Sequence, residues 1–136
     1  GFATVEYLSS AIVDIDLHVL KSADKLDVDK FEAETLGRIG MPEEIVMRHR
    51  IPHFGHIIGG YAAGYYSYMW SEVMDADAFA AFEETGDAFD SKTARKLHDF
   101  IYAAGNRRDP AAAYVAFRGR LPTPEAMLKK RGLKAA

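Results

Sequence analysis

The chain has 136 residues, 49% of them hydrophobic, and a formal net charge of -3 at pH 7. This length and apolar content suit a single domain with its own core. The charge leaves no basic surface for nucleic acid and no basic cluster that would anchor the chain to a membrane. The absence of cysteine excludes a disulfide framework and a thiolate zinc site. No apolar run reaches the length of a membrane span. We therefore expect a cytoplasmic protein without nucleic-acid or membrane partners.

The first segment, residues 4–20, has the periodicity of a long amphipathic helix. Its apolar stripe is expected to consist of Val5, Leu8, Ile12, Ile15 and Val19. Asp14, Asp16 and His18 interrupt the apolar sector. Acids two residues apart point in different directions on a helix, so we interpret them as solvated or structural groups rather than a metal chelate. The helical pattern begins almost at the first residue, and the chain is expected to be a fragment of a longer protein.

The next segment contains one short helix and a long irregular stretch. Asp29-Lys30-Phe31-Glu32 resembles a capping box, which predicts a helix as far as Leu36 that Gly37 and Gly40 end. Residues 42–52 have little periodicity and carry the basic run Arg48-His49-Arg50. We expect irregular chain there that lines a cleft.

Glycines and prolines mark the later helices. The phenol-rich segment is expected to be helical from Tyr61 to Gly86. Three more helices are each predicted to begin at a capping residue and end at a glycine: from Asp90 to Gly105, from Asp109-Pro110 to Gly119, and from Thr123-Pro124 to Gly132, with Leu133 as the hydrophobic contact. Strand signals are weak throughout and there is no internal repeat. The predicted fold class is all-α, with about six helices.

Residues 53–70 hold the strongest concentration of hydrogen-bonding and titratable side chains. On a helix starting at Tyr61, the spacing of Tyr61, Tyr65 and Tyr68 places three phenols on one face. Gly64 leaves a gap in that face, and Gly59 and Gly60 form a flexible joint next to His56. Phenols and an imidazole beside a pliable turn can grip and polarise a carbonyl group.

Core packing is an equally serious interpretation, because an aromatic stripe at helical spacing is usually buried. Two features favour a site. Glycine within a core helix costs roughly 1 kcal/mol relative to alanine, and every buried tyrosine needs a partner for its hydroxyl. The opposite face is expected to provide the packing through Tyr66, Met69, Trp70 and Val73.

Searches for established catalytic patterns give nothing in this chain. None of the five histidines lies in the H-E-x-x-H pattern of zinc peptidases. His53 and His56 are three residues apart, a spacing that would let both bind one metal ion if a helix joined them. Pro52 and the neighbouring glycines make such a helix unexpected. Gly59-Gly60 before a helix is a weak phosphate-binding signal without a following lysine. Within this chain we expect no metal site, no nucleophile and no activated water.

Several motifs together resemble the M3 family of zinc oligopeptidases, which includes thimet oligopeptidase, oligopeptidase A and the peptidyl-dipeptidase Dcp. The central motif is Phe54-Gly55-His56-x-x-Gly59-Gly60-Tyr61-x-x-x-Tyr65-Tyr66-x-Tyr68-x-Trp70-Ser71-Glu72-Val73. Shorter motifs are Gly-Phe-x-Thr-Val-Glu-Tyr at residues 1–7, Phe117 to Arg120, and Arg131 to Leu133. The resemblance covers nearly the whole chain, and the Dcp-like branch looks nearest.

This resemblance implies an α-helical, zincin-like peptidase that hydrolyses short peptides and holds zinc through H-E-x-x-H and a further glutamate. Those ligands lie upstream in the family, so residues 1–136 look like a single helical segment at the C-terminal end of the catalytic domain, predicted to be inactive alone. By the same resemblance Tyr68, Tyr61, Tyr65 and His56 have catalytic contacts, with phenols stabilising the oxyanion. The implied substrate-binding residues are His53, Gly59, Gly60, Gly64 and Tyr66.

Partners expected from this interpretation are short peptides and the upstream zinc-binding part of the same polypeptide. Surfaces that face the missing part would be exposed and apolar, and self-association of the fragment through its first helix is expected. The alternative function is a free-standing helical module that uses the phenol face to bind a peptide or a partner helix without catalysis.

Overall fold

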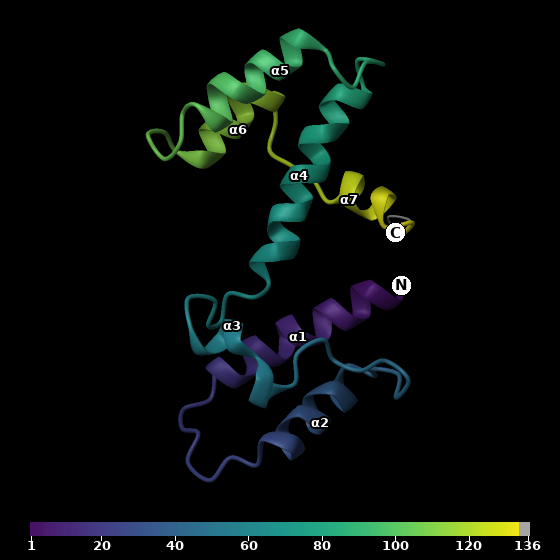
Figure 1. The fold of residues 1–136 in the computed structure, drawn as a ribbon, viewed down its shortest axis with the longest axis vertical. Helices are drawn as coiled ribbons and strands as arrows, with labels where there is room; N and C mark the ends of the chain where they lie inside the picture. The colour runs from purple at the N-terminus through teal and green to yellow at the C-terminus, as the bar shows by residue number, and fades with distance from the viewer. Residues whose placement is uncertain (134–136) are drawn as a thin grey trace. The chain divides into compact units, whose positions relative to one another are not determined.

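The computed structural model describes residues 1–133, and all regular secondary structure in this range is helical (Figure 1). The elements are α1 (Phe2–His18), α2 (Val28–Arg38), the 3-10 segment η1 (Ile51–His53), α3 (Gly55–Ile58), α4 (Ser67–Glu83), α5 (Ser91–Leu97), the π-helical segment η2 (His98–Tyr102), α6 (Pro110–Arg118) and α7 (Glu125–Lys130). The predicted all-α class is confirmed. None of the helices in the described range is long and apolar enough to cross a membrane.

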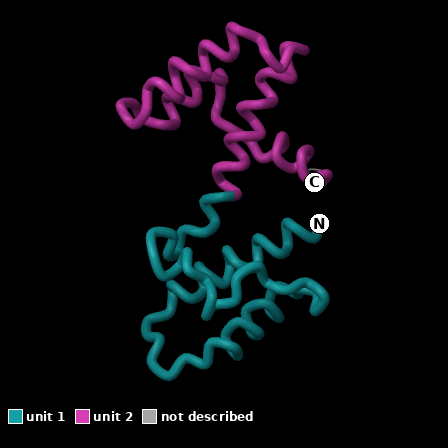
Figure 2. Tube along the Cα trace, viewed as in Figure 1, with its two compact units in different colours: residues 1–68 teal, residues 69–136 magenta. Residues whose placement is uncertain are grey.

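The chain groups into two compact units, which Figure 2 shows in different colours. The first unit comprises residues 1–68 and contains all the predicted site residues. The second unit begins at Met69.

The core of the first unit is built around Val13 of α1, together with Met47 from the irregular segment and Ile51 of η1. Four partly buried side chains pack against this cluster: Leu17, Val28, Phe31 and Leu36. The irregular segment thus provides core contacts as well as the chain that leads to the site.

The buried face of α1 differs from the predicted apolar stripe, and the prediction was wrong here. Leu8, Ile15 and Val19 are exposed, with Val19 at 71%. The buried residues are instead Tyr7, Ser9, Ser10, Ala11, Val13 and Asp14. Small and polar side chains on this face let another backbone segment approach closely and hydrogen-bond to it, which an aliphatic stripe would not allow.

The predicted capping box of α2 is also wrong. The cap is Asp27, whose carboxylate accepts a hydrogen bond from the Lys30 N–H at 3.0 Å. Glu32 is buried and accepts from the Ile51 N–H at 3.1 Å, so its carboxylate holds η1 instead of the helix start. At the other end α2 passes through Gly37. The helix ends at Arg38, and Gly40 (φ 65°) takes the left-handed position of the Schellman motif that follows.

The phenol-rich helix begins six residues later than predicted, at Ser67, and residues 61–66 form turns. The N–H groups of Ala63 and Tyr65 donate to the carboxylate of Asp14 in α1. Because those two donors are engaged by a side chain, they are not available for helical bonds to carbonyls four residues earlier. A tertiary contact therefore overrides the helical periodicity. The expected packing face is formed only in part, since Tyr66 is 52% exposed and Trp70 is 65% exposed, whereas Met69 and Val73 are half-buried.

The helix starts of the second unit were largely predicted. Asp90 and Asp109 cap α5 and α6 by accepting from the Thr93 N–H at 2.7 Å and from the Ala112 N–H at 2.8 Å. Thr123 is not the cap of α7, which begins after Pro124 without a side-chain cap. The Thr123 hydroxyl hydrogen-bonds to the Glu125 carboxylate, which lowers the pKa of that group.

The ends of α6 and α7 explain two of the short motifs. Gly119 (φ 85°) closes α6 in the left-handed conformation, between Arg118 and Arg120. At the end of α7 the Leu133 N–H donates to the Leu128 carbonyl at 2.8 Å, as the predicted Schellman ending requires. Both motifs therefore contain the glycine at which a helix stops.

A buried carboxylate joins α4 to α6 in the second unit. Asp77 is 1% exposed and accepts from the Tyr114 hydroxyl at 2.8 Å and from Arg120 Nη2 at 2.6 Å. Arg118 Nε lies 3.4 Å from the same carboxylate. Burial and the contact with Asp77 raise the pKa of Tyr114 well above its usual range. The arginines of the Phe117–Arg120 motif are thus structural in this unit.

Candidate functional site

Seven aromatic side chains of the first unit form one contact network, which we call the aromatic cluster. They come from α1, the irregular segment, α3, the turns at 61–66 and the first turn of α4. The members are Tyr7, His49, Phe54, His56, Tyr61, Tyr65 and Tyr68. The three predicted phenols therefore meet in space, although only Tyr68 lies on a helix.

Tyr65 is the centre of the aromatic cluster and is 3% exposed. Its ring stacks on that of Tyr7 with centroids 5.3 Å apart. It makes edge-to-face contacts with Phe54 and His56, at centroid distances of 4.8 Å and 5.1 Å. Tyr68 packs against it at 5.3 Å. These four ring contacts surround the Tyr65 side chain and help to fix its position.

Tyr61 and Tyr68 form the accessible edge of the aromatic cluster. Their exposed fractions are 44% and 42%, and their rings stack with centroids 5.2 Å apart. A hydrogen bond with the Tyr61 hydroxyl raises the pKa of Tyr68, and partial loss of water contact adds to the shift. Both phenols reach the surface side by side, where a ligand can contact them.

His56 lies between the accessible phenols and the buried ring. It belongs to α3, and its ring centroid is 6.0 Å from that of Tyr61 and 6.0 Å from that of Tyr68. The predicted proximity of the imidazole to the phenols is therefore present in the structure. No single helix joins His53 and His56, as predicted, because His53 ends η1, His56 lies in α3 and Phe54 separates the two elements.

His49 is a member of the cluster that the motifs did not single out. Its ring centroid lies 5.0 Å from that of His56 and 5.9 Å from that of Tyr65. Burial lowers the pKa of His49, and the positive charges of His56 and Arg48 lower it further, against a smaller opposite effect of Glu6. Little in the sequence marked His49 as a site residue, because residues 42–52 have little periodicity.

Two further residues support the site from α1. The Tyr7 hydroxyl donates to the Tyr65 carbonyl at 2.6 Å, and Asp14 accepts from the backbone of the turns. Tyr7 closes the first motif of the sequence, at residues 1–7, which could have marked it as a site residue. Asp14 gave no such signal, because its partners are backbone groups.

The remaining predicted site residues lie around the cluster and outside its ring contacts. His53 and Tyr66 are exposed, and no ring contact of the described chain includes either of them. Gly59 and Gly60 are exposed on the connection from α3. A Cβ at Gly64 would lie 3.4 Å from the Tyr61 carbonyl oxygen, which is van der Waals contact with the turn that carries Tyr61.

The site offers neutral hydrogen-bond donors and no metal-binding group. Among residues 1–133, no group of three or more His, Asp or Glu side chains could hold a metal ion. Two phenol hydroxyls and an imidazole at one edge can donate to a carbonyl oxygen as it gains negative charge. The chemistry that this edge supports is polarisation and binding of an amide.

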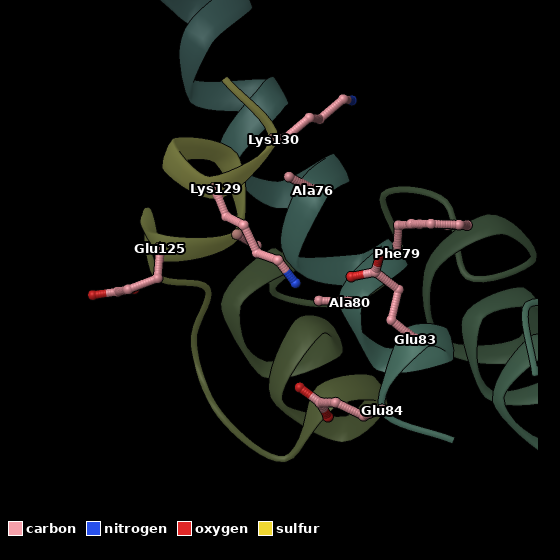
Figure 3. Close-up of a pocket in the computed structure, with 9 residues that line it drawn as sticks. Ala76, Phe79, Ala80, Glu83, Glu84, Glu125, Lys129 and Lys130 are labelled. Atoms are coloured by element: carbon pink, nitrogen blue, oxygen red, sulfur yellow. The ribbon is translucent and has the colours of Figure 1, made fainter. Parts of the chain in front are cut away.

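A second concave surface lies between α4 and α7, within the second unit (Figure 3). Its volume is about 610 Å³, and its charged lining residues come from both helices. Two of them are already paired, Glu84 with Arg118 and Lys130 with Asp75. This groove contains none of the predicted site residues, and we place the candidate site at the aromatic cluster.

Comparison with known proteins gives a consistent set of relatives. Peptidase family M3 matches residues 1–133. The organellar oligopeptidase A of Arabidopsis thaliana is 39% identical over 145 aligned residues, which cover 100% of this chain and 18% of that protein. The Escherichia coli oligopeptidase A is 48% identical over 62% of this chain and 13% of its own length.

A dipeptidyl carboxypeptidase of Salmonella typhimurium is 35% identical over 98% of this chain and 20% of its own length. Its identity is lower than that of either oligopeptidase A, so these values do not single out the Dcp-like branch. The chain spans a fifth or less of the length of each of these three relatives.

Proposed function

The chain belongs to peptidase family M3, and from this premise we propose that it is the substrate-binding and oxyanion-stabilising segment of a metallopeptidase that hydrolyses short peptides. The observation that carries the proposal is the pair of accessible phenols, Tyr61 and Tyr68, stacked 5.2 Å apart next to His56. Peptide substrates are also consistent with the oligopeptidase and carboxypeptidase names of the relatives.

The phenols suit the chemistry of amide hydrolysis. When a nucleophile attacks the scissile carbonyl, negative charge develops on its oxygen, and a donor already in place stabilises that charge without reorganising. A phenol is neutral at pH 7 and does not form a competing ion pair. The raised pKa of Tyr68 keeps its proton in place further into the alkaline range. We assign the main donor role to Tyr68, with Tyr61 as the second donor.

The other residues of the edge are proposed to hold the peptide. His56 faces both accessible phenols and can donate to the substrate backbone. Gly59 and Gly60 give the connection room to approach the peptide closely, and His53, Gly64 and Tyr66 flank that connection. Tyr65, which is buried, contributes through the position of the rings that surround it.

Zinc is implied by the family, and the residues of this chain do not fit a zinc site. Structural and catalytic zinc requires three or four nitrogen, sulfur or oxygen ligands converging on one point. No such group is found among residues 1–133. We propose that the zinc ligands belong to another part of the intact enzyme and that the present chain alone hydrolyses nothing.

Substitution of Tyr68 tests the proposal. In the full-length enzyme, Tyr68→Phe keeps the ring and removes the donor, so we expect kcat to fall by about 100-fold with little change in KM. The matched control is Tyr102→Phe, which removes a hydroxyl from an exposed tyrosine of the second unit. An unchanged kcat would remove Tyr68 from catalysis. A raised KM without loss of kcat would make Tyr68 a substrate-binding residue and would contradict its role as the oxyanion donor.

A further inference from the structure

The starting point is a fully buried carboxylate whose two oxygens bind a different part of the chain. Asp14 lies on α1 and is 0% exposed. Its Oδ1 accepts from the Ala63 N–H at 2.9 Å, and its Oδ2 accepts from the Tyr65 N–H at 2.9 Å. His18 Nδ1 also lies 2.9 Å from Oδ1. Both oxygens of Asp14 are thus bonded to the turns that carry the phenols.

The conformation of those turns depends on this contact. Ala63 has φ 55°, the left-handed region that a residue with a Cβ rarely adopts. The N–H groups of Ala63 and Tyr65 both point to the Asp14 carboxylate, and N–H groups that converge in this way in a turn form an anion-binding site. Hydrogen bonds to a carboxylate are stronger than those between neutral groups, which makes the contact able to hold a strained residue.

A second residue of α1 holds the same peptide unit from its carbonyl side. The Tyr7 hydroxyl donates to the Tyr65 carbonyl at 2.6 Å, and the two rings stack. Tyr7 and Asp14 are seven residues apart, two helical turns, and therefore lie on one face of α1. One rigid helix thus fixes both the N–H and the C=O of Tyr65.

The phenols are connected to this point by short links. The Gly64 N–H donates to the Tyr61 carbonyl at 2.8 Å, and the Tyr68 N–H donates to the Tyr65 carbonyl at 3.4 Å. Any shift of Tyr65 therefore moves the backbone that carries Tyr61 on one side and the start of α4 with Tyr68 on the other.

We propose that Asp14 and Tyr7 are positioning residues that set the place of the Tyr61 and Tyr68 hydroxyls by clamping the backbone of Tyr65 to α1. This inference rests on the proposed function, because it assigns a catalytic consequence to the clamp. If Asp14 and Tyr7 had a structural role alone, substituting them would lower the stability of the enzyme and leave kcat of the folded fraction unchanged.

Hydrogen exchange of the full-length enzyme tests the clamp without reference to activity. In Asp14→Asn the side chain retains one acceptor oxygen, so one of the two N–H groups faces an amide nitrogen instead of an acceptor. Peptides covering residues 59–66 are expected to exchange at least tenfold faster, while peptides of α2 are unchanged. The matched control is Asp16→Asn, two residues away on α1, whose carboxylate pairs with Arg38 of α2. Unchanged exchange in Asp14→Asn would overturn the clamp.

Kinetics test the catalytic consequence. Asp14→Asn is expected to lower kcat at least tenfold with KM within threefold, and Asp16→Asn is expected to leave both unchanged. When Asp14→Asn is combined with Tyr68→Phe, the loss should be smaller than the product of the separate losses, because both changes affect the same donor. Fully multiplicative losses would contradict action through Tyr68.

The two proposals fail in different ways. If Tyr68→Phe leaves kcat unchanged, the proposed function is wrong, and the exchange experiment still decides whether the clamp exists. If Tyr68→Phe lowers kcat and Asp14→Asn changes neither exchange nor kcat, only the clamp is wrong. Should Asp14→Asn not fold, Tyr7→Phe removes one hydroxyl, keeps the stacked ring, and is expected to give the same changes to a smaller degree. No change in exchange or kcat in that variant would overturn the proposal.

Discussion

Two residues of the aromatic cluster, His49 and Tyr68, have pKa values that neighbouring groups shift in favour of the neutral form. Burial and the positive charges of His56 and Arg48 lower the pKa of His49, which disfavours its protonated form. The hydrogen bond with Tyr61 and the loss of water raise the pKa of Tyr68, which disfavours its ionised form. Around neutral pH these two shifts favour a neutral imidazole at His49 and a neutral phenol at Tyr68.

The lowered pKa of His49 predicts a specific pH dependence of stability. In the unfolded chain His49 has its ordinary pKa of 6.5, so below that pH the unfolded state binds more protons than the folded state. The free energy of unfolding should therefore be at its full value above pH 6.5 and decrease as the pH falls below it. His49→Gln should show a smaller decrease between pH 7.5 and 5.5 in urea titrations. An equal decrease in both proteins would contradict the lowered pKa.

Sequence reasoning identified the phenols and His56 because they lie in one continuous motif. It placed His49 in a segment that lines a cleft without giving it a role, because residues 42–52 lack periodicity. Asp14 was interpreted as a solvated or structural group, and the structure shows it buried. Its partners are backbone N–H groups, which no pattern of side chains reveals.

At the level of elements, local capping signals were more reliable than the periodicity of the phenol-rich segment. Asp90 and Asp109 cap the helices they were expected to cap, because the cap contact is made within four residues. The start of α4 at Ser67 could not be predicted, since it depends on a carboxylate 49 residues away from Ala63. The start of a helix can be predicted from sequence when a neighbouring residue caps it. It cannot be predicted in this way when it depends on a contact with a residue far away in the chain.

The buried contact between α4 and α6 gives a prediction at this scale. Arg118 lies against Asp77, and their side chains are 9% and 1% exposed. Removing the guanidinium in Arg118→Ala leaves a buried carboxylate with fewer partners, which should reduce the free energy of unfolding by about 3 kcal/mol. The measurement is the midpoint of denaturant unfolding, with Arg95→Ala as a control at an exposed arginine of α5. Equal midpoints for the two variants would show that the contact contributes little.

For the whole molecule, the all-α class and membership of family M3 agree with the sequence patterns over residues 1–133. The sequence was treated as a single helical segment, and the structure divides its contacts into two units. The chain corresponds to a fifth or less of the length of the three relatives described. We therefore propose that activity be tested in the full-length protein, where we expect the metal ligands to lie.

The central claim is that the phenol edge binds the transition state more tightly than the substrate. The direct measurement compares two dissociation constants in the full-length enzyme and its Tyr68→Phe variant. One ligand is an uncleavable peptide that keeps a planar amide, and the other is the matching phosphinic peptide, whose tetrahedral centre carries negative charge. We predict that Tyr68→Phe weakens binding of the phosphinic peptide by about 100-fold and of the planar peptide by less than about threefold. Equal weakening of both ligands, or of neither, would contradict the account.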